Sequence, residues 1–152
     1  MSLRDKIQLN QNEIHDYLVN QNDIHIGTIN KDGSPHLTTM WYSMRGTDII
    51  FHTYTKSQKI KNLSRDSRIS ILTESGKTYE TLKGLMLYGN ATIINGDNNE
   101  DEVIQIIKEV EEKYSKGSAS EEYIEFMKNQ SSKRSGVLVR VSKYISWDHT
   151  KI

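Results

Sequence analysis

A stretch in the first half of the chain carries residue types that bind phosphate groups. Residues 53–63 read TYTKSQKIKNL and combine hydroxyl side chains at Thr53 and Ser57 with an amine at Lys59. Hydroxyls before the first turn of a helix, free backbone amides and a nearby ammonium group supply what a phosphate monoester needs. An N-capped surface helix with solvated lysines has the same spacing, and spacing alone favours this second interpretation. Lys56 and Lys61 are expected to lie in solvent.

A second stretch, residues 37–42 with the sequence LTTMWY, places Thr39, Met40, Trp41 and Tyr42 on a strand expected beside the one that ends at Thr53. A flat heteroaromatic ring needs an apolar surface and backbone amides at a strand edge, and such a strand provides both. Strand periodicity offers a simpler interpretation, with Met40 and Tyr42 in the core and Trp41 covering a surface or an interface. Periodicity alone favours the simpler interpretation.

The elements that must position these residues alternate between short strands and amphipathic helices. Hydrophobic periodicity and turn residues predict helices and strands in the following order: a helix over 5–21, strands over 25–30, 35–44 and 49–53, a short helix around 59–63, strands over 69–73 and 82–94, helices over 100–116 and 121–129, and a last strand over 136–141 that continues toward residue 147. Gly84 and Gly89 suggest bulges or close backbone approaches in the long strand. The chain therefore has about six strands with helices inserted.

This order predicts the fold class. The strands follow one another through hairpin turns such as Asp32-Gly33, and the βαβ rhythm of parallel sheets is missing. We expect a mainly β (α+β) fold, a closed or partly open antiparallel barrel with peripheral helices, formed by one domain over 1–152. The sequence contains neither GxGxxG nor a Walker motif, so it does not support the usual dinucleotide and nucleoside-triphosphate sites.

Composition excludes several function classes. The 152 residues include 20 Lys and Arg against 20 Asp and Glu, which argues against binding nucleic acid or an anionic membrane through net charge. Cysteine is absent, which removes disulfides and thiolate sites and suggests a cytoplasmic location. The apolar runs are too short to span a membrane. The five histidines lack metal-ligand spacing, so we expect no metal site, although a cluster of His25, His36 and His52 on neighbouring strands is conceivable.

Several motifs, taken in order, resemble the pyridoxamine 5'-phosphate oxidase-like flavin-binding split barrels. They are TINKDGSPH over 28–36, MWY over 40–42, the pattern T-x3-S-x-K-x2-NL-x2-D-x-R over 53–68, YGNAT over 88–92 and SWD over 146–148. The resemblance covers nearly the whole chain. It implies a six-stranded antiparallel split β-barrel, a homodimer, and two cofactor sites at the subunit interface that hold FMN or a deazaflavin relative.

The resemblance also implies roles for individual residues. Thr53, Ser57 and Lys59 match the phosphate-side positions, with Asn62 close by on the same short helix. Thr39, Met40, Trp41 and Tyr42 match the strand along the ring system, although many relatives have proline where this chain has Thr39. The last matching residue, Trp147, corresponds to a segment that approaches the cofactor of the other subunit.

The function expected from this resemblance is that of a flavin-dependent oxidoreductase, which binds FMN non-covalently and transfers hydride or electrons to or from a small organic substrate. A true pyridoxamine phosphate oxidase is not expected, because those enzymes carry arginine-rich segments near the C-terminus and this chain ends SWDHTKI. Two alternatives stay open: a deazaflavin-dependent reductase of the same fold, and a non-catalytic protein that binds flavin or haem, in which a histidine would be the axial ligand.

Overall fold

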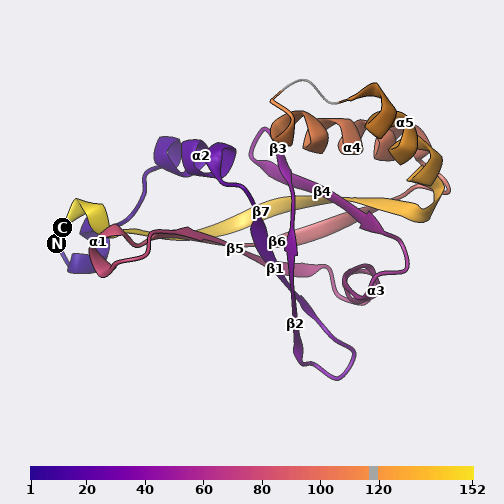
Figure 1. The fold of residues 1–152 in the computed structure, drawn as a ribbon. Helices are drawn as coiled ribbons and strands as arrows, with labels where there is room; N and C mark the ends of the chain where they lie inside the picture. Colours follow the sequence, from indigo (N-terminus) through magenta and orange to yellow (C-terminus); the bar gives the residue numbers. More distant parts are fainter. Residues whose placement is uncertain (117–119) are drawn as a thin grey trace.

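A seven-stranded antiparallel sheet forms the body of the molecule in the computed structural model, which describes residues 1–116 and 120–152 (Figure 1). The strands are β1 (Ile24–Ile29), β2 (Pro35–Met40), β3 (Ser43–Arg45), β4 (Asp48–Tyr54), β5 (Arg68–Ser75), β6 (Lys83–Asn95) and β7 (Arg134–Asp148). Their order across the sheet is β2-β1-β5-β6-β7-β4-β3. The antiparallel α+β class predicted from the sequence is confirmed, but the sheet has seven strands instead of six.

The additional strand arises because the predicted strand over 35–44 is interrupted. It splits into β2 and β3, which lie at opposite edges of the sheet and are joined by Trp41 and Tyr42 alone. Three Cα–Cα steps span at most about 11 Å, so the two edges must approach each other at this corner. The ladders run from β2 through to β3 without pairing these two strands, so the barrel is split and the sheet is not closed.

The helices lie around the sheet. They are α1 (Leu3–Lys6), α2 (Gln11–Asn20), α3 (Gln58–Arg65), α4 (Glu100–Tyr114) and α5 (Glu121–Gln130), with three short 3-10 turns, η1 (Tyr79–Thr81), η2 (Ser131–Lys133) and η3 (His149–Lys151). The single helix predicted over 5–21 is wrong, since Asn10 begins a new helix with a capping box in which its side chain accepts from the Glu13 amide. Leu9, just before this cap, is buried in the core.

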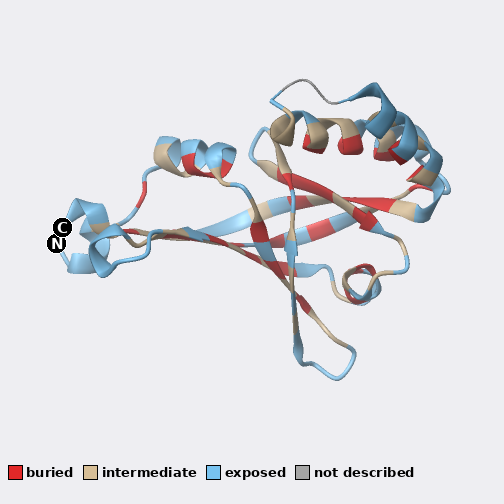
Figure 2. Ribbon diagram, viewed as in Figure 1, coloured by how far each residue is buried: buried red, intermediate tan, exposed pale blue. Residues whose placement is uncertain are grey.

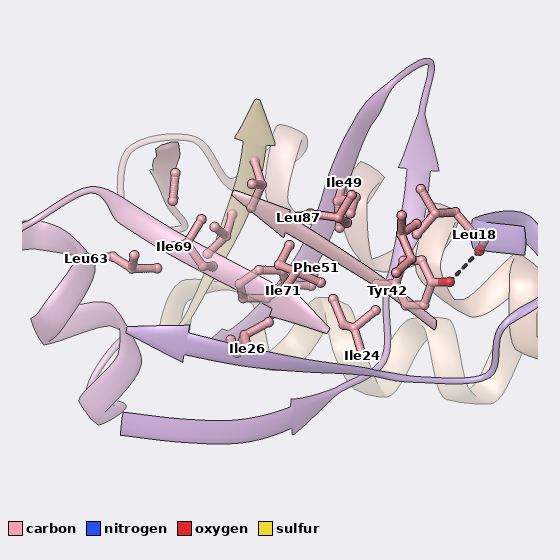
Figure 3. Close-up of a cluster of buried hydrophobic side chains, with 14 of the residues drawn as sticks. Leu18, Ile24, Ile26, Tyr42, Ile49, Phe51, Leu63, Ile69, Ile71 and Leu87 are labelled. Atoms are coloured by element: carbon pink, nitrogen blue, oxygen red, sulfur yellow. Dashed lines mark hydrogen bonds between the residues drawn. The ribbon is translucent and has the colours of Figure 1, made fainter. Parts of the chain in front are cut away.

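Two apolar layers hold these elements together (Figure 2). The larger core lies on one face of the sheet, under α2 and α3, and contains Ile26, Phe51 and Leu63 (Figure 3). The other face of β4 and β7 packs against α4, where Ile50 contacts a smaller cluster that includes Ile106. Alternate residues of β4 therefore face different layers, which decides where its polar residues point.

The two glycines singled out in the long strand behave as the sequence predicts. A register shift between Tyr88 and Gly89 marks a bulge, and a Cβ on Gly89 would lie 2.4 Å from the Arg140 carbonyl oxygen. A Cβ on Gly84 would lie 2.1 Å from the ring of Trp147, which covers this glycine from β7. None of the helices in the described residues is long and apolar enough to cross a membrane.

Candidate functional site

The end of β4 and the start of α3 bring three of the predicted phosphate-side residues to one corner. The Lys59 Nζ donates a hydrogen bond to the Thr53 Oγ1 over 3.4 Å. Burial lowers the pKa of the Lys59 amine, and no carboxylate in the described parts of the chain pairs with it. The neighbouring Lys56 and Lys61 are exposed, as predicted. Lys59 is thus a half-buried cation without a counterion.

Ser57 occupies the N-cap position of α3 but does not act as a cap. Its hydroxyl makes no capping hydrogen bond, and the Oγ atom is buried without a partner. A buried hydroxyl that lacks a hydrogen bond costs about 1–3 kcal/mol, so such a group calls for an explanation. The hydroxyl is free to bind a ligand oxygen, which distinguishes this corner from an ordinary capped surface helix.

Asn62, on the same helix, has a different role from its neighbours. It is fully buried, and its Nδ2 donates to Thr28 Oγ1 over 3.1 Å and to Asn30 Oδ1 over 3.0 Å. Its Oδ1 accepts from the Gln58 Nε2 over 2.9 Å and also from Arg65. Because both the Nδ2 and the Oδ1 of its amide already have partners, Asn62 links α3 to β1 and supports the corner from the buried side.

The stretch around the β2–β3 connection follows strand periodicity. Met40 packs against the core and Tyr42 is completely buried, with its hydroxyl donating to the Leu18 carbonyl oxygen (Figure 3). Trp41 is 52% exposed and stacks on Tyr114, with ring centroids 4.1 Å apart. The structure therefore separates these side chains onto two faces and does not bring them together with Lys59.

A groove on the outer face of the sheet runs across β2, β1, β5 and β6. It consists of two adjoining hollows of about 580 and 380 Å³ that share Gly27, Leu37 and Ser70 in their linings. Thr39 lines the second hollow and is the predicted site residue found there. Leu37, which also lines both hollows, is 74% exposed, so an apolar surface is available beside β2.

Trp147 lies far from the β4–α3 corner within one chain. It pairs with Gly84 near the end of β7, whereas Ser135, which pairs with Thr53, lies near the beginning of the same strand. Twelve residues of strand separate Trp147 from Ser135, a span of about 40 Å. In a single chain, therefore, Trp147 does not join Thr53 and Lys59.

The three strand histidines do not form the conceivable cluster. His25 lies exposed on the outer face, where its Nδ1 hydrogen bonds to Thr39 Oγ1. His36 pairs with the buried Thr28 on the core face, and its Nδ1 is buried without a partner. His52 is on β4, four strands away from β1 across the sheet. The described residues hold no group of three or more metal-ligating side chains.

The sequence analysis did not single out Arg134 or its contact with His52 beside the corner. The Arg134 Nη1 donates to the His52 Nδ1 over 3.1 Å, on the opposite face of β4 from Thr53. Burial, and then the Arg134 charge, lower the pKa of His52 to about 4. The local sequence holds no signal for this contact, because it depends on β4 pairing with a strand 80 residues later.

Comparisons with known proteins agree with this architecture. The family model described as pyridoxamine 5'-phosphate oxidase matches residues 11–147. The chain is similar to the structure of the conserved hypothetical protein Rv2991 from Mycobacterium tuberculosis, with 35% identity, a TM-score of 0.87, and coverage of 99% of this chain and 92% of that one. None of the curated proteins compared with the chain matches it.

Two more distant structures share the fold. An F420 reductase is 17% identical with a TM-score of 0.61, and the alignment covers 85% of this chain and 94% of that one. HutZ, the haem storage protein from Vibrio cholerae, is 13% identical with a TM-score of 0.67, and the alignment covers 90% of this chain and 94% of that one. The fold thus occurs in proteins that handle different cofactors, and the family match over most of its length shows that this chain belongs to the pyridoxamine 5'-phosphate oxidase family.

Proposed function

We propose that the chain is an FMN-dependent oxidoreductase that binds its cofactor non-covalently between two copies of itself. The observation that carries the proposal is the buried, unpartnered Ser57 hydroxyl at the N-cap of the helix that carries the half-buried Lys59 amine. A phosphate group would satisfy both, since it offers acceptor oxygens and negative charge. Membership of a family with flavin-binding and deazaflavin-binding members supports the same assignment.

Each residue of the corner has a separate task in this proposal. Lys59 neutralises part of the phosphate charge, and the hydroxyls of Thr53 and Ser57 donate hydrogen bonds to phosphate oxygens. Asn62 binds no ligand atom through its saturated amide and instead holds α3 in place. The strand that contains Thr39 and Met40 lies along the ring, with backbone groups of Trp41 and Tyr42 at its end. The bound isoalloxazine supplies the redox chemistry.

The proposed substrate is a small organic molecule that exchanges hydride or electrons with the cofactor. The apolar hollows beside Thr39 offer space for such a molecule. A cytoplasmic location, suggested by the absence of cysteine, completes the proposal.

FMN binding by Lys59 variants tests the phosphate assignment. The Lys59→Ala change should weaken FMN binding by about 1.5–3 kcal/mol, because a charged hydrogen bond is lost. Riboflavin has the same ring system without the phosphate, so its affinity should be unchanged, and Lys61→Ala is the matched control in the same helix. Equal FMN affinity of Lys59→Ala and the wild-type protein in a fluorescence titration would reject the role of Lys59.

A homodimer is part of the proposal, since Trp147 reaches a cofactor at Lys59 only from a second copy. Sedimentation equilibrium should give about twice the 17.6 kDa of one chain. A mixed dimer of one Lys59→Ala and one Trp147→Ala subunit should keep one intact FMN site, because the intact Lys59 and the intact Trp147 then meet across the interface. If each site belonged to one subunit, the mixed dimer would have no intact site.

Direct comparison of cofactors separates the alternatives. FMN, a deazaflavin coenzyme and haem are offered to the purified protein, and retention after desalting is followed by visible absorption. Retention of the deazaflavin alone would replace the FMN proposal by a deazaflavin-dependent reductase. Retention of haem alone, or of a reduced flavin that no acceptor reoxidises, would identify a protein that carries its ligand without turnover.

A further inference from the structure

Arg134 lies on the face of β4 that the proposed phosphate corner does not use. It is the first residue of β7 and pairs with Tyr54. Its guanidinium carbon is 4.4 Å from the centre of the Tyr54 ring, and its Nη1 donates to His52. Successive residues of a strand point to opposite faces, so Thr53, between His52 and Tyr54, points the other way. Arg134 and Lys59 thus lie on opposite faces of the sheet at the end of β4.

The Arg134 guanidinium is partly buried and has no counterion. Arg45 pairs with Glu102 and Glu109, and Arg68 pairs with Asp66, whereas no carboxylate in the described residues pairs with Arg134. The Nε of Arg134 is buried without a hydrogen-bond partner. Leaving a charged donor unsatisfied in a buried position is costly, so the missing partner is the feature that needs an explanation.

His52 leaves the positive charge of this cluster on Arg134 alone. Because the pKa of His52 is lowered to about 4, its ring is neutral at neutral pH. Its Nδ1 accepts the hydrogen bond from Arg134, so the ring proton sits on Nε2. One N–H of the Arg134 Nη1 is thereby used, whereas the buried Nε has no hydrogen-bond partner. A guanidinium edge presents two parallel N–H donors.

We propose that Arg134, oriented by His52, binds the carboxylate group of a small organic acid. Two parallel donors match the two oxygens of a carboxylate, and a single positive charge matches a monoanion better than a phosphate dianion. Tyr54, which is 54% exposed, flanks the guanidinium, and Arg134 itself is partly exposed. Tyr123 of α5 lies near enough to Arg134 for the two groups to interact electrostatically. This site does not depend on the proposed FMN site.

Acetate is the probe that tests this site in the flavin-free full-length chain. The imidazole nitrogen signals of His52 are followed by NMR while sodium acetate replaces sodium chloride at constant ionic strength. Acetate should shift these signals in a saturable manner, and the neutral analogue acetamide should leave them unchanged. Signals that do not respond to acetate, or that respond equally to acetamide, would overturn the proposal.

Two variants connect the signal to Arg134. Arg134→Lys keeps the charge but loses the two parallel donors, so acetate affinity should fall by about tenfold or more. Lys59→Gln is the matched control on the other face and should bind acetate as the wild-type protein does. Loss of acetate binding in Lys59→Gln, with retention in Arg134→Lys, would assign the anion to the phosphate corner and overturn the separate site.

FMN and inorganic phosphate complete the test. Arg134→Lys should bind FMN with wild-type affinity, so failure of the carboxylate site and failure of the FMN site are distinguishable. An FMN affinity that falls in Arg134→Lys would make Arg134 part of the phosphate site instead. Tighter binding of inorganic phosphate than of acetate at the His52 signals would contradict the carboxylate assignment. Arg134→Met keeps the assay interpretable if Arg134→Lys is poorly folded, because it also lacks the two parallel donors and should show no acetate response.

Discussion

Two corners of the molecule contain predicted site residues, and they differ in how well their polar groups are satisfied. At the β2–β3 corner, the Tyr42 amide donates to the Tyr114 hydroxyl over 3.1 Å, and the Tyr42 hydroxyl donates to Leu18. The Lys113 Nζ lies 3.4 Å from the centre of the Tyr42 ring. At the β4–α3 corner, the Ser57 hydroxyl has no partner, and the Lys59 amine has one long hydrogen bond, to Thr53. Side chains with complete sets of partners hold the fold, and side chains without them are available to ligands.

The largest effect expected from this comparison is on stability at the β2–β3 corner. Tyr42→Ala should lower the free energy of unfolding by about 3–5 kcal/mol, because it leaves a cavity in a fully buried position. Trp41→Ala is the matched control and should cost less than about 1.5 kcal/mol, since Trp41 is half exposed and contacts one ring. Urea denaturation followed by circular dichroism measures both. A cost for Trp41→Ala as large as that for Tyr42→Ala would remove the distinction between the two faces.

The next largest effect is a difference in stability between variants of two residues of α3. Asn62→Ala should lower the free energy of unfolding by about 1–3 kcal/mol, because Thr28 and Asn30 lose their buried donor. Lys59→Ala should have little effect on stability, since its amine makes one long hydrogen bond. Denaturation without cofactor compares the two variants. If Lys59→Ala were the less stable, Lys59 would belong with the structural residues.

Much of this contrast could be predicted from local sequence. The Asp32-Gly33 hairpin, the short helix after Ser57 and the inward alternation of Met40 and Tyr42 all follow from local turn chemistry and periodicity. The spacing of Thr53, Ser57 and Lys59 likewise predicted a polar cluster at a helix start. These features depend on residues a few positions apart, which is why a single sequence reveals them.

Other features depend on contacts between distant parts of the chain. The break at Trp41 was not predicted, because it is fixed by Tyr42 contacting Leu18 and Tyr114, 24 and 72 residues away. Arg134 meets His52 only through the β4–β7 register. The break at Asn10 is different, since Asn10 and Glu13 are a capping box that the sequence does display. Periodicity concealed it, because the apolar spacing continues across the break.

The pH dependence of stability probes the buried amine at the β2–β3 corner. Burial lowers the pKa of Lys113 to about 8, below its usual value of 10.5. Between these two values the unfolded chain binds more protons than the folded chain, so this group makes stability rise with pH from about 8 to 10.5. Lys113→Met should remove this part of the rise. Urea midpoints of both proteins at pH 7.5 and 9.5 measure it, and parallel changes would show that the amine titrates normally.

The smallest effect, on Ser57, distinguishes the two corners most sharply. In an ordinary N-cap, replacing serine by alanine costs about 1 kcal/mol of stability. The Ser57 hydroxyl makes no capping bond and is buried without a partner, so Ser57→Ala should leave the cofactor-free protein equally stable or slightly more stable. FMN binding should nevertheless weaken by about 1 kcal/mol, because one hydrogen bond to the phosphate is lost.

Ser120→Ala is the matched control for Ser57→Ala. The Ser120 hydroxyl does cap α5 by accepting from the Tyr123 amide, so its loss should lower stability without changing FMN affinity. If Ser57→Ala lowered stability as much as Ser120→Ala and left FMN affinity unchanged, Ser57 would be a structural cap and the contrast between the corners would rest on Lys59 alone.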